Sequence, residues 1–435
     1  MPRRAPGSIL IASSVLLLAT LAAALGFAPP SAPPSAPTPA SDPVKQLQAW
    51  LAQDATTRGA LESQDFATQK LTKAQAKQAQ RLLWEAHVAQ TRPQREAEWN
   101  AKAIELQGKR MKWETRTFGE APKAGHALYI SLHGGGGAPP EVNEGQWRNQ
   151  IDLYRPAEGI YIAPRAPTDT WNLWHEDHMD ALLDRLIEDA VLFAGVDTDR
   201  VYVMGYSAGG DGVYQLAPRM ADRWAAASMM AGHPGDADAR TLRNLPFSVQ
   251  VGERDGAYDR NTRATEFGAK LAELQEKDPK GYEHVVKLYP GKGHWMDRLD
   301  AEAVPWMAKH TRAARPKRVV WVQDDALRPR LYWLVAPKES QKQGALLAAT
   351  IKGQRVEFDA ASTAPQAVVL LDDALVDLDK PVTIAVGDRT VWQGTVPRRM
   401  VDIAASLAER ADPKMIFPAR VPAEIVAASE KKGTP

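Results

Sequence analysis

Between residues 127 and 309 the sequence alternates short apolar segments with segments of helical periodicity, and this alternation constrains the fold more than any other feature. Apolar segments of strand length predict β-strands at 127–132, 159–163, 200–204, 225–231, 247–251 and 283–289. Helical spacing follows from about residue 179, after residue 207, at 262–275 and near 300–309. A helix between two strands returns the chain to the end where the first strand began, so neighbouring strands run parallel. The predicted fold class is therefore α/β, with a mostly parallel sheet and helices on both faces.

Three segments precede this region. Residues 1–26 carry two arginines and then an uncharged apolar run, which is typical of an export signal peptide or, if uncleaved, of an N-terminal membrane anchor. Residues 27–43 are too rich in proline to pack and predict an extended linker. Residues 44–110 have helical periodicity, with Thr72 suited to cap one helix and Pro93 suited to begin another. We therefore expect an exported protein, either periplasmic or secreted, or one that its N-terminal segment tethers to a membrane.

In residues 316–430 helical periodicity largely gives way to short strands. These strands are predicted at 319–322, 330–335, 346–351, 355–358, 368–371 and 382–386. Gly353 and Gly387 stand where hairpin turns need a positive φ. We therefore expect a β-sandwich-like C-terminal accessory domain, which follows an α/β domain spanning residues 111–313.

Charge and composition exclude several functions. Lys and Arg number 54 against 53 Asp and Glu, for a net charge of +1, so no large positive field attracts phosphate backbones and nucleic acid is not an expected partner. The sequence has no cysteine, which excludes disulfides, a thiol nucleophile and a cysteine-linked lipid anchor. An apolar fraction of 44% and a charged fraction of 25% are typical of a soluble chain with a large core.

The strongest chemical signal is a serine in the pattern G-x-S-x-G, formed by Gly205, Ser207 and Gly209. The motif directly follows the strand at 200–204 and precedes a helix-compatible segment, which is the strand-turn-helix context that the motif requires. The two glycines let the chain pass close to its neighbours while the turn exposes the Ser207 hydroxyl at the helix N-terminus. Ser207 is therefore the predicted nucleophile; the alternative is a helix-capping serine in a tight glycine turn.

A glycine-rich loop follows the strand at 127–132, where His133 precedes four glycines. Such a loop can present backbone N–H groups to a developing oxyanion. The N–H groups of Gly134 or Gly135 and of Ala208 would form a two-donor oxyanion hole, and His133 is expected to anchor the loop. The alternatives are a flexible loop or a phosphate cradle, but the Lys-Ser/Thr pair of a P-loop does not follow.

A serine nucleophile needs a base that takes its proton and a third group that orients the base. Among nine histidines, His294 is favoured, because it lies in a loop directly after the last predicted sheet strand. The loop after strand 247–251 offers Asp255 as the orienting acid, with Asp259 as the second candidate. Glu253 in the same loop is expected to pair with its neighbour in sequence or with solvent.

His175 and His178 stand three residues apart beside acidic residues, a spacing that suggests a metal site. No third ligand at a known spacing supports zinc, so we predict no metal and instead expect both histidines to line the cleft or to cap the helix that follows.

Four tryptophans fall in or beside loops at the carboxyl ends of predicted strands, where ligands bind in α/β sheets: Trp147, Trp171, Trp174 and Trp295. Their faces are candidates for holding a sugar or an aryl group. The alternative is that they pack in the core or at the rim.

Four motifs, GYSAGG, HGGGG, GERD and GKGH, make residues 111–313 resemble an α/β-hydrolase. The chain is most similar to the exported esterase and depolymerase branch, including feruloyl-esterase-like and polyhydroxyalkanoate-depolymerase-like enzymes, and it also resembles prolyl-oligopeptidase-type catalytic domains. The resemblance implies an eight-stranded sheet, a covalent acyl-enzyme and no cofactor. It covers about half of the chain and assigns nothing to the N-terminal helices or the C-terminal domain.

The sequence therefore predicts an exported serine hydrolase of carboxylic esters, in which Ser207 attacks the acyl carbon, His294 transfers the proton and Asp255 orients His294. A bulky substrate is expected, polymeric or carbohydrate-linked, because residues 232–246 are too few for a helical cap over the cleft. One alternative is a serine peptidase of prolyl-oligopeptidase type, although the helical segment before the catalytic domain is too short for a propeller. The other is a non-catalytic binding or scaffold protein of the cell envelope.

Overall fold

The computed structural model describes residues 42–426, so the predicted signal or anchor and nearly all of the proline-rich linker lie outside the described residues. No helix in the described range is long and apolar enough to cross a membrane. From Asp42 onward the described chain forms one unit.

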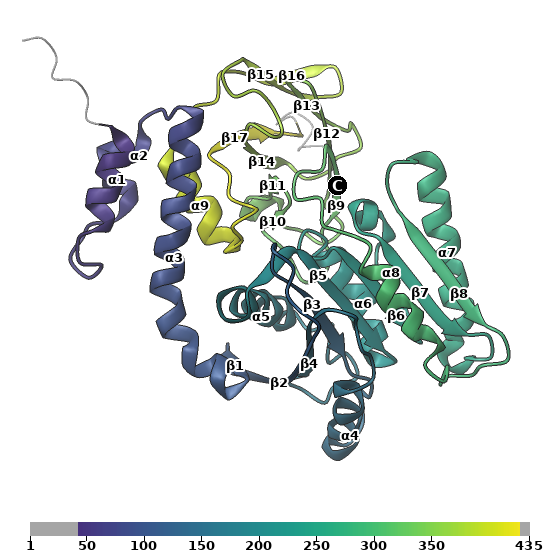
Figure 1. Cartoon of the computed structure of the whole chain (residues 1–435). Coiled ribbons are helices and arrows are strands. Elements are labelled where there is room, and N and C mark those ends of the chain that lie inside the picture. Colours follow the sequence, from purple (N-terminus) through teal and green to yellow (C-terminus); the bar gives the residue numbers. More distant parts are fainter. Residues whose placement is uncertain (1–41, 427–435) are drawn as a thin grey trace, which may run out of the picture. The chain divides into compact units, whose positions relative to one another are not determined.

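An eight-stranded sheet lies at the centre of the fold, with its strands in the order β1-β2-β4-β3-β5-β6-β7-β8 (Figure 1). β1 pairs antiparallel with β2, and β2 pairs antiparallel with β4, whereas all other neighbours in the sheet are parallel. The strands are β1 (Ala103–Leu106), β2 (Lys109–Phe118), β3 (His126–Leu132), β4 (Gly159–Arg165), β5 (Val196–Tyr206), β6 (Ala226–Met230), β7 (Phe247–Gly252) and β8 (His284–Tyr289). The predicted mostly parallel sheet is confirmed.

Helices cover both faces of this sheet. The helices are α4 (Pro140–Ile151) and α8 (Ala303–Met307) on one face, and α5 (His178–Ala194), α6 (Ala208–Arg219) and α7 (Arg260–Lys277) on the other. Tyr129 and Met204 of the strands pack with Met307 of α8, while Ile130 and Val203, which point the opposite way, belong to the core beneath α5, α6 and α7. The opposite directions follow from the two-residue period of a strand, and burial on both faces explains why these strands are apolar throughout.

The N-terminal helices are α1 (Pro43–Leu51), α2 (Asp65–Thr68) and α3 (Lys73–Ala101), with the 3₁₀ turn η1 (Leu61–Ser63) between the first two. Thr72 caps α3 as predicted, in a capping box with Gln75. The prediction of a new helix at Pro93 is wrong, because α3 continues through this proline. Proline removes one helical hydrogen bond, but ion pairs on the same stretch hold the helix against α5: Arg95 pairs with Glu188 at 2.6 Å.

Residues 103–106, which were expected to end a helix, form β1 instead. Gln107 and Gly108 both have positive φ, and they make the two-residue turn that joins β1 to β2. The edge of the sheet therefore begins within the segment predicted to be helical.

The N-terminal helices pack against the side of the molecule rather than over the α/β sheet. Their apolar residues, including Leu47, Phe66 and Leu83, share a cluster with Ile403 and Leu407 of α9 (Met400–Arg410). Figure 1 shows α3 running beside α9 and then past α5.

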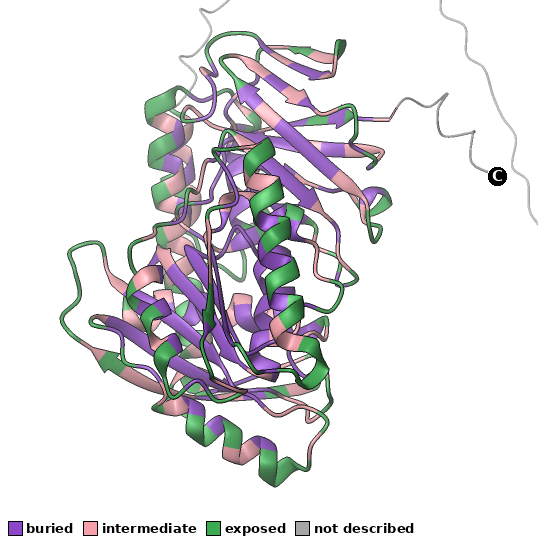
Figure 2. Cartoon of the chain, turned by 90° about the vertical axis from the view of Figure 1, so that its right-hand side faces the viewer, coloured by how far each residue is buried: buried purple, intermediate pink, exposed green. Residues whose placement is uncertain are grey.

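The C-terminal part contains two further sheets, with strand orders β16-β15-β13-β12-β9 and β10-β11-β14-β17. Their strands are β9 (Arg318–Val322), β10 (Arg330–Leu331), β11 (Leu334–Val335), β12 (Leu346–Lys352), β13 (Arg355–Phe358), β14 (Gln366–Leu371), β15 (Val382–Val386), β16 (Arg389–Gly394) and β17 (Ala419–Glu424). The single strand expected at 330–335 is broken at Tyr332, whose φ of 51° turns the chain back. Figure 2 shows that buried residues concentrate in the strands of all sheets, while the outward faces of the helices are exposed.

Buried charges join the C-terminal sheets to the α/β sheet. The carboxylate of Asp222, which is 1% exposed, accepts hydrogen bonds from the Tyr332 backbone N–H at 2.9 Å and from Arg410 Nη2 at 2.6 Å. Arg312 donates to Asp412 at 2.7 Å, and both side chains are buried. The region after residue 313 is therefore packed into the α/β part rather than attached by a free linker.

Candidate active site

Ser207 stands between β5 and α6 in a strained turn, with φ of 58° and ψ of −122°. Backbone with positive φ is costly for a residue that has a Cβ, so the surrounding packing must enforce it. The flanking glycines permit this packing: a Cβ on Gly205 would lie 2.3 Å from the Gly209 carbonyl oxygen, and one on Gly209 would lie 2.1 Å from that of Leu132. The two glycines of the motif are therefore required because neighbouring backbone segments lie too close for a side chain at either position.

The structure brings the three residues of the predicted triad together. His294 Nε2 lies 3.0 Å from Ser207 Oγ, and His294 Nδ1 lies 2.9 Å from Asp255 Oδ2. The Asp255 side chain is 1% exposed, whereas that of His294 is 43% exposed and reaches the cleft. Asp259, the second candidate acid, is exposed and makes no hydrogen bond to His294.

The loops that carry His294 and Asp255 support each other. A Cβ on Gly252 would lie 2.1 Å from the Gly293 carbonyl oxygen, so the two loops touch through their backbones. Glu253 braces them further, because its carboxylate accepts the Gly291 N–H at 2.7 Å. Glu253 is exposed to solvent, as expected, but it makes no ion pair with Arg254.

Tyr206, the residue before the serine, also holds the histidine loop. Its hydroxyl donates to the His294 carbonyl at 2.6 Å and accepts from the Met296 N–H at 3.1 Å. Burial raises the pKa of Tyr206, so the phenol stays protonated and keeps its donor role. The residue pattern around Tyr206 does not predict this role.

The glycine loop lies beside Ser207, in the place expected of an oxyanion hole. A Cβ on Gly134 would come within 3.1 Å of the Ser207 Cβ, so this backbone passes against the serine. The Gly136 N–H donates to Asn143 Oδ1 at 2.8 Å and is occupied, whereas the N–H groups of Gly134 and Gly135 donate to none of the described residues. Ala208 is the first residue of α6, so its N–H has no partner within the helix. Asn143, which sequence reasoning missed, orders the loop from α4.

His133 anchors this loop from below, as expected. It is fully buried; Nε2 accepts the Ala166 N–H at 3.1 Å, and Nδ1 lies 2.6 Å from the Gly134 carbonyl oxygen. Because burial penalises the imidazolium, the pKa of His133 falls to about 3. The neutral ring, protonated at Nδ1, can satisfy both contacts at once.

Two clefts lie beside the glycine loop, and Ser207 lines the larger of them. The larger one, about 640 Å³, is lined by Ser207 and His294 together with Val142, Gln146, Leu153, Trp295 and Arg298. The smaller one, about 260 Å³, shares Gly135 with it and is lined by Ala208, Trp171, Asp211, His233, Tyr258 and Arg260. Residues of α1, α2 and α3 line neither cleft, so these helices do not cover the site.

The four tryptophans divide into two pairs. Trp171 is 71% exposed at the smaller cleft, and Trp295 is 50% exposed at the larger one. Trp147 and Trp174 are buried: their indole N–H groups donate at 2.9 Å to a β4 carbonyl and to the His133 carbonyl. The expectation that Trp147 and Trp174 contact substrate is therefore corrected, because their apolar rings fill the core beneath the site.

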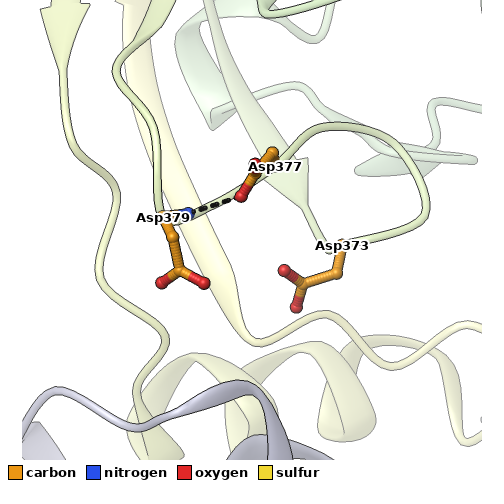
Figure 3. A group of neighbouring side chains, drawn as sticks. All are labelled: Asp373, Asp377 and Asp379. Carbon is orange, nitrogen blue, oxygen red and sulfur yellow. Dashed lines mark hydrogen bonds between the residues drawn. The ribbon is translucent and has the colours of Figure 1, made fainter.

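His175 and His178, the pair whose spacing suggested a metal site, belong to no cluster of metal-ligating side chains among the described residues. His178 begins α5, and its Nδ1 lies 3.2 Å from the Glu176 carboxylate. Within residues 42–426, three carboxylates converge instead at Asp373, Asp377 and Asp379 (Figure 3). The buried guanidinium of Arg398 donates to Asp373 at 2.9 Å and to Asp379 at 2.8 Å. An arginine therefore already balances the charge of this cluster.

The order of the strands, with the serine after β5, the acid after β7 and the histidine after β8, is that of the α/β-hydrolase fold, and residues 103–307 adopt this fold.

No protein-family model and no curated protein matches this chain. Solved structures match over about half of it. A thermostable esterase is 18% identical, with 48% of this chain and 62% of that chain covered and a TM-score of 0.38. The BES protein from Bacillus cereus is 11% identical, with 47% and 93% covered and a TM-score of 0.36. Est1E from Butyrivibrio proteoclasticus is 16% identical, with 48% and 97% covered and a TM-score of 0.33. The chain thus spans less than two thirds of the thermostable esterase.

Proposed function

We propose that the protein is a serine hydrolase that cleaves carboxylic esters through an acyl-enzyme. The observation that carries this proposal is the continuous chain of contacts from Asp255 through His294 to Ser207, at a strained turn that opens into a cleft. Nucleophile, base and orienting acid are all within hydrogen-bond reach, which is the geometry that activates a serine.

In the first half-reaction, Ser207 Oγ attacks the carbonyl carbon while His294 Nε2 takes the hydroxyl proton. Asp255 accepts the Nδ1–H, which keeps Nε2 free as the base and stabilises the imidazolium that forms. The carbonyl oxygen becomes an oxyanion. The imidazolium then gives its proton to the leaving-group oxygen, the bond between acyl carbon and that oxygen breaks, and an alcohol departs.

The oxyanion would be stabilised by backbone donors on two sides. The Ala208 N–H at the start of α6 supplies one, and the Gly134 or Gly135 N–H supplies the other. Donors that are fixed before the reaction cost no reorganisation, and removing one such donor typically costs about 10²- to 10³-fold in kcat.

In the second half-reaction, water replaces the alcohol. His294 Nε2 takes a proton from water as the water oxygen attacks the acyl carbon, and it returns that proton to Ser207 Oγ when the acyl-enzyme bond breaks. The products are a carboxylic acid and free enzyme. No other reactant is needed, because both proton transfers pass through one imidazole.

An ester is favoured over a peptide because it has the better leaving group, so the triad and the oxyanion donors suffice. The N-terminal helices pack on α9 and α5 and leave the clefts uncovered, which suits a bulky or polymeric ester. Trp171 and Trp295 are exposed at the two clefts and could stack on a ring of such a substrate.

The test is to measure kcat/KM on ethyl butyrate and on an aminoacyl anilide, for the unmodified protein and for Ser207→Ala. We expect ester hydrolysis to fall by at least about 10³-fold in the variant, as in other triad deletions. Near-full activity in Ser207→Ala would exclude this mechanism. A larger rate enhancement on the anilide than on the ester, each relative to its uncatalysed rate, would assign a peptidase instead.

We also propose that residues 1–26 export the protein, on the basis of their two arginines and uncharged apolar run. Fractionation of cells that express the full chain, followed by N-terminal sequencing, tests this. A mature N-terminus near residue 27 outside the cytoplasm supports a cleaved signal, and an intact N-terminus in the membrane fraction supports an anchor.

A further inference from the structure

The two clefts share Gly135, and the larger one is lined by Ser207; they can be assigned to the two halves of an ester. This assignment rests on the proposed hydrolase function. His294 must hand its proton to the leaving oxygen, so the alcohol lies on the side of the imidazole. The larger cleft contains His294 and the neighbouring Trp295 and is therefore the alcohol side.

The smaller cleft is the acyl side. Like the larger cleft, it is lined by proposed oxyanion donors, here Gly135 and Ala208, but unlike the larger cleft it does not include His294. Its volume of about 260 Å³ lies below the range of about 300 to 1,000 Å³ that holds drug-sized ligands, so a short acyl group fills it. A long or branched acid would have to extend past Trp171 into solvent.

Arg260 supplies unused hydrogen-bond donors to the acyl side. Its Nη1 donates to the Ala257 carbonyl at 3.3 Å and lies 4.0 Å from Asp255 Oδ1. Nε is buried without an acceptor, and Nη2 donates to none of the described residues. Since the side chain is only 11% exposed, this donor capacity is held within the protein rather than in open water.

Asp211 places a carboxylate in the same cleft. Its Oδ1 accepts the His233 N–H at 2.6 Å, and it forms no ion pair with Arg260. Burial raises the pKa of Asp211 to about 6, so the group is largely ionised at neutral pH but is poorly solvated. His233 adds no charge, because its Nδ1 accepts the Gly235 N–H and burial lowers its pKa.

The acyl side thus holds one positive and one negative side chain that do not pair with each other, although the Arg260 guanidinium also lies 4.8 Å from the centroid of the Tyr258 ring. We propose that it selects esters of short acids that carry, a few bonds from the carbonyl, a neutral group able both to accept and to donate a hydrogen bond, such as a hydroxyl or an amide. Such a group accepts from Arg260 and donates to Asp211. A carboxylate would be attracted by Arg260 but repelled by Asp211, and an ammonium group would meet the reverse, whereas a neutral group can bond to both without an opposing charge.

Isosteric ethyl esters test the proposal, since they differ only in the group under question. Ethyl 3-hydroxypropanoate is compared with ethyl butyrate, and ethyl succinamate with monoethyl succinate, by titrating released acid at pH 7.5. We expect the hydroxyl and amide esters to have about tenfold higher kcat/KM than their partners, because a desolvated site that hydrogen-bonds a substrate group discriminates against an analogue lacking it. Ethyl 3-aminopropanoate should be a poor substrate.

Two variants link the preference to the two side chains. Arg260→Gln should abolish the preference for 3-hydroxypropanoate over butyrate, whereas Arg263→Gln, an exposed arginine three residues along α7 that pairs with Glu266, should leave it unchanged. Asp211→Asn should raise kcat/KM for monoethyl succinate relative to ethyl succinamate, because the repelling charge is gone. Ratios between substrates on one variant cancel any general loss of activity.

The alcohol side gives a further control. The ratio of kcat/KM for 2-hydroxyethyl butyrate to that for propyl butyrate should not change in Arg260→Gln. If this ratio changes and the ratio for ethyl 3-hydroxypropanoate over ethyl butyrate does not, the assignment of the clefts is reversed and the proposal fails. Equal rates on hydroxyl and alkyl acids, or a preference for the charged esters, would also overturn it while leaving ester hydrolysis established. Absence of hydrolysis of all these esters would refute the proposed function itself.

Discussion

Replacing His133 tests whether a buried neutral imidazole holds the oxyanion loop. The ring is fully buried and its pKa is lowered to about 3, below the value of about 6.5 of an exposed histidine. Its Nε2 accepts the Ala166 N–H, so protonation would set two donors against each other. The unfolded chain binds this proton below about pH 6.5 and the folded chain does not until about pH 3, so stability from this group is full above pH 6.5 and is lost as pH falls.

The size of the effect follows from the two pKa values. Lowering the pH from 7 to 5 reduces the free energy of unfolding by about 2 kcal/mol through this one group. Each pH unit below the pKa of the unfolded chain contributes about 1.4 kcal/mol. His133→Gln has no titrating ring and should not show this loss. Its amide oxygen can still accept a backbone N–H, although the fit in the cavity will be worse.

The assay is urea denaturation of both proteins at pH 7 and pH 5. From pH 7 to pH 5 the free energy of unfolding of the unmodified protein should fall by about 2 kcal/mol more than that of His133→Gln. The other titrating groups are common to both proteins, so their contributions cancel. A difference near zero would show that His133 can be protonated in the folded protein. A neutral His133 ring would then not be what anchors the glycine loop.

Two further predictions concern the acid of the triad and the C-terminal interface. Asp255→Asn should lower kcat by several orders of magnitude, because the amide leaves His294 in the wrong tautomer, whereas Asp259→Asn should have little effect; kinetics on ethyl butyrate decides, and the reverse ranking would move the acid to Asp259. Asp222→Ala should destabilise the fold by about 3 to 5 kcal/mol, because the buried Arg410 loses its partner, while Glu266→Ala on the surface should change little. Equal urea midpoints for these two variants would contradict the inferred packing of the C-terminal sheets.

Much of the α/β fold could be predicted because its parallel strands are buried on both faces and therefore appear as continuous apolar segments. The predicted strand at 127–132 is one residue shorter than β3, and that at 247–251 is one residue shorter than β7. The chemical motifs could also be recognised in the sequence. Gly205 and Gly209 are needed because other backbone segments pass too close to them to leave room for a side chain.

What could not be predicted depends on contacts between distant segments. Pro93 stays inside α3 because ion pairs hold this helix against α5, about a hundred residues away in sequence. Helix-termination rules use only neighbouring residues, so they could not predict this. Trp147 and Trp171 were both expected near strand ends, but Trp147 lies on α4 and packs into the core, whereas Trp171 is exposed. Tyr206 acts through a backbone carbonyl 88 residues further along the chain and Asn143 through a backbone N–H seven residues before it, and neither residue type formed a recognisable pattern.

The central claim, that Ser207 is an activated nucleophile, is tested most directly by covalent labelling. The protein is incubated with a fluorophosphonate, and its intact mass and labelled peptide are measured by mass spectrometry, beside Ser207→Ala. The account predicts one phosphonyl group per molecule on Ser207, with ester hydrolysis lost in step, and no label on the variant. An unlabelled protein, or a label on another serine that persists in Ser207→Ala, would contradict it.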